Sequence, residues 1–156
     1  MNNFWKYLAH DPPTLKRTWE SIKDIMAPGA LDAVTKEMVY LAVSVTNGCA
    51  YCIDMHTKDA RAAGETEQRL YALSAWRETP FFTPRERAAL AWTEAVTLIS
   101  ETHAPDDVYE AVRAQFSDAE TVNLTMLIAT INAWNRLAIS FRAVPQIKAD
   151  VKANAA

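Results

Sequence analysis

The chain has little cysteine and little glycine. Its 156 residues include two cysteines and three glycines. A secreted scaffold held together by disulfides would carry more cysteines, spread along the chain. So few glycines, with abundant alanine, leucine and glutamate, favour helices over a turn-rich β fold. No basic stretch precedes an apolar run at the N-terminus, so a secretory signal is not expected.

Blocks of like charge and long apolar runs are also missing. The formal net charge is -3, without a basic cluster that would indicate a nucleic-acid surface. The most apolar segment, residues 122–141, contains three asparagines and an arginine, too many polar groups for a membrane span. We therefore expect no nucleic-acid partner, no membrane partner and a cytoplasmic location. The length suits one domain over residues 1–156, and the 50% hydrophobic content allows a sizeable core.

Capping signals predict a compact all-α fold of about six or seven helices. N-cap residues followed by proline, or by the glutamate of a capping box, mark helix starts at Asp11, Thr83 and Ser117. Apolar residues at helical spacing predict a helix that opens at Asp32 or Thr35 and is buried nearly all round. The expected helices cover about residues 12–26, 32–47, 49–63, 66–76, 83–100, 105–115 and 117–141, and no run reads as a strand.

The two cysteines, Cys49 and Cys52, lie at the start of a predicted helix, just after Gly48. The first turn of a helix offers unpaired N–H groups and the positive end of the helix dipole, and both stabilise a thiolate. At least one of the two thiols should therefore have a lowered pKa. Two intervening residues let the sulfurs meet across one turn, so that a disulfide can close without refolding. A lone C-x-x-C of this kind is typical of redox or metal chemistry.

A histidine and a glutamate are placed to serve the dithiol. His56 follows Cys52 by four residues and so lies on the same helix face, where an imidazole could take the thiol proton. Glu37 lies on the preceding helix at the edge of its apolar stripe, where a carboxylate needs a partner. We expect it to face His56 across the helical hairpin, orient the imidazole and pass protons on.

Other interpretations of these four residues stay open. Cys49, Cys52, His56 and Glu37 could together bind zinc, although structural zinc sites usually draw a second ligand pair from a distant segment. The cysteines could be small buried hydrophobes, the histidine a surface residue and the glutamate a solvated charge. The asparagines and arginine of residues 132–136 are expected to form a buried hydrogen-bond network or a subunit contact.

The pattern Glu37-x11-Cys49-x2-Cys52-x3-His56 resembles the signature of the alkyl hydroperoxidase D-like proteins, within the carboxymuconolactone decarboxylase superfamily. The resemblance covers most of the chain. It is strongest over residues 31–64 and extends to residues 76–78, 85–87 and 131–136. The motif is specific, because a glutamate, two cysteines and a histidine must all be in register.

This resemblance implies a helical fold whose central hairpin carries the dithiol, assembled as a homotrimer or homohexamer. It implies a thiol-dependent peroxidase in which Cys52 attacks the peroxide, Cys49 resolves the product, and His56 and Glu37 relay protons. A dithiol or lipoyl-type protein would be the reductant, with no metal and no cofactor. A non-catalytic redox sensor or adaptor and a disulfide reductase are the alternatives. A decarboxylase is less expected, since superfamily decarboxylases generally lack the dithiol.

The chain departs from the family pattern at one position. The best-studied peroxidases of the family have a second histidine immediately before the second cysteine, where this chain has Tyr51. An unperturbed phenol has a pKa of ~10, which makes it a poorer proton carrier than imidazole at neutral pH. Peroxidase activity is therefore expected to be weaker, or directed at a different substrate.

Overall fold

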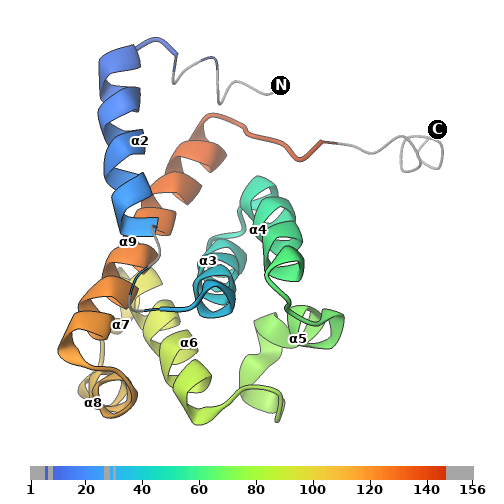
Figure 1. Cartoon of the computed structure of the whole chain (residues 1–156), viewed down its shortest axis with the longest axis vertical. Helices are drawn as coiled ribbons and strands as arrows, with labels where there is room; N and C mark the ends of the chain where they lie inside the picture. The colour runs from blue at the N-terminus through green and yellow to red at the C-terminus, as the bar shows by residue number, and fades with distance from the viewer. Residues whose placement is uncertain (1–5, 7–8, 27–28, 30, 147–156) are drawn as a thin grey trace, which may run out of the picture.

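A computed structural model describes residues 6, 9–26, 29 and 31–146 of the chain. Within these residues the fold is all helical, as predicted, and holds no strand (Figure 1). The elements are α2 (Pro12–Met26), α3 (Ala33–Asn47), α4 (Ala50–Ala62), α5 (Glu67–Ala72), the 3-10 helix η1 (Leu73–Glu78), α6 (Pro84–Thr97), α7 (Ile99–Thr102), α8 (Asp106–Gln115) and α9 (Asp118–Ser140).

The predicted caps begin the helices. The Asp11 carboxylate accepts a hydrogen bond from the backbone N–H of Thr14 at the start of α2. Asp32 caps α3 through the backbone and the hydroxyl of Thr35, at 2.9 and 2.7 Å. Thr83 and Ser117 each form a complete capping box at the starts of α6 and α9. The helix starts read from the sequence are therefore confirmed.

Two predicted helices are each divided in two. The segment expected as one helix over residues 66–76 continues beyond α5 as η1, with Ala75 outside helical geometry (φ -121°, ψ 32°). This change of direction accompanies the burial of Leu73 and Trp76. The helix expected to end near residue 100 breaks at Leu98, and the Thr102 hydroxyl donates to the carbonyl of Ala95 at 2.7 Å.

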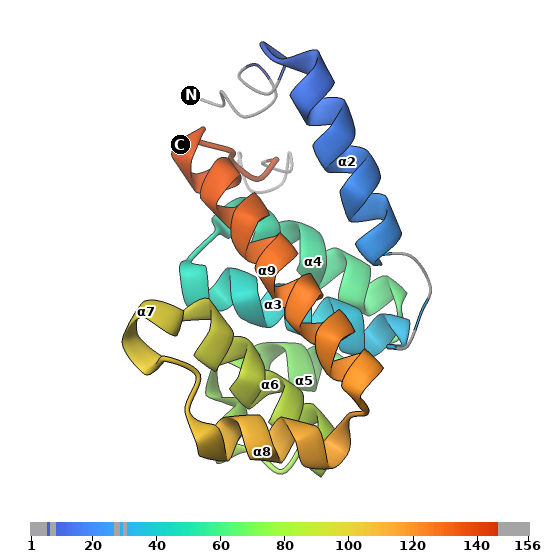
Figure 2. The ribbon, with the colours of Figure 1, turned by 90° about the vertical axis from the view of Figure 1, so that its left-hand side faces the viewer.

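Helix α3 is the centre of the fold. It packs against α4, α6 and α9, and every residue from Met38 to Ser44 is buried. Figure 2 shows α9 running across α3, with α2 standing at the outer side of α9. The side chains of α3 and α9 share one core cluster with those of α6 and α8, which includes Tyr40, Leu127 and Ile128. This packing fixes the hairpin of α3 and α4 on the body of the protein.

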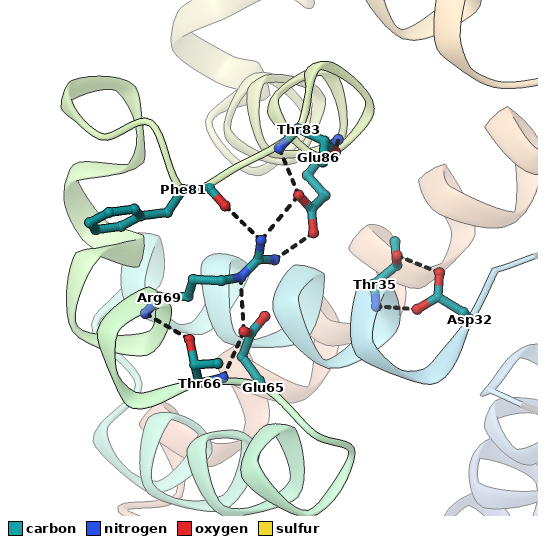
Figure 3. Close-up of polar contacts among 8 residues, drawn as sticks. All are labelled: Asp32, Thr35, Glu65, Thr66, Arg69, Phe81, Thr83 and Glu86. Carbon is teal, nitrogen blue, oxygen red and sulfur yellow. Dashed lines mark hydrogen bonds and ion pairs between the residues drawn. The ribbon is translucent and has the colours of Figure 1, made fainter.

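An arginine clamp holds α5 against α6 (Figure 3). The guanidinium of Arg69 donates to Glu65 at 2.8 Å, to the Phe81 carbonyl at 2.7 Å and to Glu86 at 2.5 Å. Glu86 also accepts from the backbone N–H of Thr83, so the α6 capping box belongs to the same network. Burial raises the pKa of Glu86, but hydrogen bonds from Arg69 and Thr83 outweigh it, and the pKa lies below its ordinary value.

In the part of the chain described above, none of the helices has both the length and the apolar character needed to span a membrane.

Candidate active site

The C-x-x-C lies at the joint between α3 and α4. Gly48 ends α3 in the left-handed conformation (φ 68°), which glycine adopts without strain. The backbone N–H of Cys49 then donates to the Ser44 carbonyl at 2.9 Å, and Cys49 becomes the N-cap of α4. The predicted order of helix, Asn47-Gly48 turn and helix start at Cys49 is therefore confirmed.

Cys49 and Cys52 form a disulfide, with their Cα atoms 5.3 Å apart. Both are buried, at 1% and 4% exposure. The backbone N–H of Cys52 donates to the sulfur of Cys49 at 3.4 Å. A backbone N–H at the helix N-terminus therefore points at the sulfur of Cys49, while Cys52 lies one turn before His56.

A network of asparagines ties this joint to α9. The amide nitrogen of Asn47 donates to the side-chain oxygens of both Asn132 and Asn135, each at 3.0 Å. Asn135 in turn donates to the hydroxyl of Ser44 at 3.3 Å, and Arg136 donates to the side chain of Asn132 at 2.9 Å. The expected buried network at residues 132–136 is present, and it holds the dithiol against α9.

Glu37 and His56 face each other across the hairpin. Glu37 Oε2 lies 3.0 Å from His56 Nδ1, and their side chains are 19% and 5% exposed. When Glu37 is ionised, its carboxylate only accepts hydrogen bonds, and Nδ1 of His56 is the donor. In a neutral imidazole with that tautomer, Nε2 has the lone pair and is the atom that can act as a base.

These side chains border a cavity of about 290 Å³, which we call the dithiol cavity. Cys52, His56 and Glu37 line one part of it, whereas Cys49 does not line it. The remaining wall is mostly apolar and comprises Trp19, Met55, Ile131, Trp134 and Ala138, with Tyr51, Asp59 and Asn135. A molecule in this cavity would meet the sulfur of Cys52 rather than that of Cys49.

Trp19 and Asp59 are among the cavity residues that sequence reasoning did not assign to the site. Trp19 of α2 meets Trp134 of α9 edge to face, with ring centroids 6.1 Å apart, and thereby brings α2 to the cavity. Asp59 follows His56 by three residues on α4, a spacing that places both on one helix face. That spacing was visible in the sequence, whereas nothing local indicated Trp19.

The structure also bears on the zinc alternative. The two sulfurs are bonded to each other, so they are not arranged as zinc ligands. The potential ligand atoms of Glu37, His56 and Asp59 lie within 4.8 Å of one another and could hold a divalent cation. Two of these three residues are the predicted proton relay, so a cation there would occupy the same groups.

Comparison with known proteins identifies the family. The model of the carboxymuconolactone decarboxylase family matches residues 12–95. The uncharacterized protein YdfG of Bacillus subtilis is 47% identical over 111 residues, which cover 71% of this chain and 76% of that protein.

Solved structures share the fold. A protein of unknown function from Agrobacterium tumefaciens, provisionally assigned to antioxidant defence as AhpD, superimposes with a TM-score of 0.87 at 42% identity. The match covers 91% of this chain and 97% of that protein. The debrominase Bmp8 superimposes with a TM-score of 0.79 over 94% of this chain and 77% of its own, but its 21% identity establishes a common fold only. This chain therefore belongs to the carboxymuconolactone decarboxylase family, as an alkyl hydroperoxidase D-like protein.

Proposed function

We propose that this protein is a thiol-dependent peroxidase that reduces organic hydroperoxides at Cys52. The observation that carries the proposal is the placement of Cys52 on a mostly apolar cavity beside the Glu37–His56 pair. A peroxide in that cavity would reach a sulfur, a base and a carboxylate at once. The alkyl hydroperoxidase D-like fold and the relative provisionally assigned to antioxidant defence support the same proposal.

The reaction proceeds in three balanced steps. In the reduced protein His56 accepts the thiol proton, and the Cys52 thiolate attacks the distal peroxide oxygen. The O–O bond breaks, Cys52 becomes a sulfenic acid, and the leaving alkoxide takes the proton from His56 to give an alcohol. The thiolate of Cys49 then attacks the Cys52 sulfur and forms the disulfide, and the displaced hydroxide takes a proton to leave as water. A dithiol reductant finally supplies two electrons, and the two released cysteine sulfurs take up two protons.

The remaining features of the proposal come from the family resemblance and from the cavity wall. The reductant is a dithiol or lipoyl-type protein, and the assembly is a homotrimer or homohexamer. The apolar wall favours an organic hydroperoxide over hydrogen peroxide, because burying apolar surface adds binding free energy only for the organic substrate. Tyr51 lines the cavity where related peroxidases have a histidine, so proton transfer depends on His56 and the carboxylates beside it.

The decisive experiment measures consumption of cumene hydroperoxide with dihydrolipoamide as the electron donor. Wild type should turn over, Cys52→Ser should be inactive, and Cys49→Ser should react once and stop as a sulfenic acid. Equal turnover by wild type and Cys52→Ser would contradict the proposal. Disulfide formation without turnover for any peroxide would instead indicate a redox sensor.

A further inference from the structure

A second cavity, of about 440 Å³, adjoins Glu37. We call it the polar cavity. Asp32, Lys36 and Tyr40 line it with Glu37, together with Gly29, Leu31 and Ala33. Glu37, whose carboxylate bonds to His56, therefore borders both the dithiol cavity and the polar cavity.

The dithiol cavity and the polar cavity differ in the side chains that line them. The dithiol cavity is walled mainly by tryptophan, methionine, isoleucine and alanine, and a bound substrate or reductant would expel its water. The polar cavity is lined by Asp32 and Lys36 as well as Glu37, and their charged groups can hold ordered water. Asp32 stays ionised there: burial raises its pKa, but hydrogen bonds from the Thr35 side chain and backbone lower it below the ordinary value.

The hydroxyl of Tyr40 is buried without a hydrogen-bond partner among the described residues. The Tyr40 ring lies 5.2 Å from the ring of His56, and the side chain is almost fully buried. Burial and the charge of Glu37 raise the pKa of Tyr40, so the phenol is neutral and keeps its proton. A buried hydroxyl without a partner destabilises the fold, and such groups in native proteins usually serve another purpose.

The chemistry of the dithiol requires protons from solvent. A reductant attacks a disulfide as a thiolate, so it brings no proton with the attacking sulfur, and each cysteine sulfur that is released takes up a proton. During that step the reductant occupies the dithiol cavity. His56 and Glu37 must then exchange protons with solvent by another route.

We propose that protons pass between solvent and the Glu37–His56 pair through the polar cavity, on which Glu37 lies. The proposal rests on the proposed function of the dithiol. The titratable groups that border the two cavities beside Glu37 and His56 are Asp32, Lys36, Tyr40, Tyr51, Cys52 and Asp59. Of these, Asp59 is exposed and lines the dithiol cavity, so it marks the competing route.

The test closes each route in turn and follows oxidation of the reduced protein by dithionitrobenzoate and by cumene hydroperoxide. With the first probe the released thiolate stays ionised, so the Cys52 proton has to leave for solvent. Ala33→Trp blocks the polar cavity from an exposed position in the first turn of α3. Ala119→Trp is its control, at an exposed position in the first turn of α9. Ala33→Trp should slow the reaction with dithionitrobenzoate about tenfold, less than the 10²–10⁴-fold contribution of a general base, with a larger solvent deuterium isotope effect. It should leave the reaction with cumene hydroperoxide unchanged, because there the thiol proton leaves with the alcohol.

Rates with dithionitrobenzoate for Ala33→Trp that equal those of Ala119→Trp would overturn the proposal. So would a tenfold loss in Asp59→Asn with none in Ala33→Trp, since protons would then pass at the mouth of the dithiol cavity. A wild type that reacts with dithionitrobenzoate but with no peroxide would refute the proposed function alone, and the variants would still decide the route.

Discussion

Glu37 Oε2 and His56 Nδ1 are 3.0 Å apart and join the two arms of the hairpin that carries the dithiol. Eighteen residues separate Glu37 and His56 along the chain. They meet because α3 and α4 fold back on each other with this register. The contact orients the imidazole while the hairpin turn holds the sulfurs, so the proposed base and the proposed nucleophile are positioned by the same pair of helices.

His56→Ala should slow oxidation of Cys52 by peroxide about 10²–10⁴-fold, because it removes the adjacent general base. Glu37→Gln keeps the shape and removes the charge, so its loss should be smaller. The double variant should be little worse than His56→Ala, since both residues act along one path. Single-turnover rate constants measure this, and losses that multiply would mean that the two residues act independently.

Cys52 should be alkylated before Cys49 in the reduced protein. Cys52 lines the dithiol cavity, whereas Cys49 is 1% exposed and does not line it. Brief treatment with iodoacetamide, followed by fragmentation of the peptide that contains both residues, locates the modified sulfur. Faster labelling of Cys49, whose sulfur accepts the N–H of Cys52 at the helix start, would reverse the assigned roles.

Arg69→Met should lower the free energy of unfolding by about 2–3 kcal/mol, somewhat below the range for fully buried ion pairs. The substitution leaves the carboxylates of Glu65 and Glu86 without their cation, although their side chains are only 7% and 19% exposed. Arg61→Met removes the exposed pair with Glu67 and should leave the urea midpoint nearly unchanged. Equal midpoints for the two variants would show that the clamp on α5 contributes no net stability.

Acid should weaken the same clamp. The pKa of Glu86 is lower in the folded protein than its ordinary value, so its contribution to stability is complete above the unfolded pKa of ~4.3 and is lost as the pH falls through the folded pKa. Urea midpoints of wild type and Glu86→Gln should therefore differ at pH 7 and converge toward pH 3. A difference that is constant with pH would mean that the Glu86 charge is not responsible.

The helices could be predicted because their signals are local. Asp32, Thr83 and Ser117 each cap a helix through atoms three residues away, and the sequence shows such pairs directly. The breaks at Ala75 and Leu98 have no such signal, because the burial of Trp76 and the hydrogen bond from Thr102 depend on tertiary packing.

The candidate site also has a part that local sequence spacing predicts and a part that depends on tertiary packing. The positions of Cys49, Cys52 and His56 follow from spacing on one helix, and a single helix–helix contact adds Glu37. Trp19 comes from a helix far earlier in the chain, and the polar cavity forms only where the start of α3 meets the segment before it. No local pattern encodes either feature. The catalytic roles of the four residues stay predictions.

The double hydrogen bond from Asn47 to α9 has a consequence for how this scaffold can change. The same helix that holds the C-x-x-C turn also supplies Ile131, Trp134 and Ala138 to the cavity wall. The C-x-x-C turn and this part of the cavity wall are thus both attached to α9, and a wall side chain can be exchanged without moving the sulfur. For the proposed peroxidase, single substitutions on α9 can therefore change the preferred substrate within a lineage, while the cysteine pair is kept.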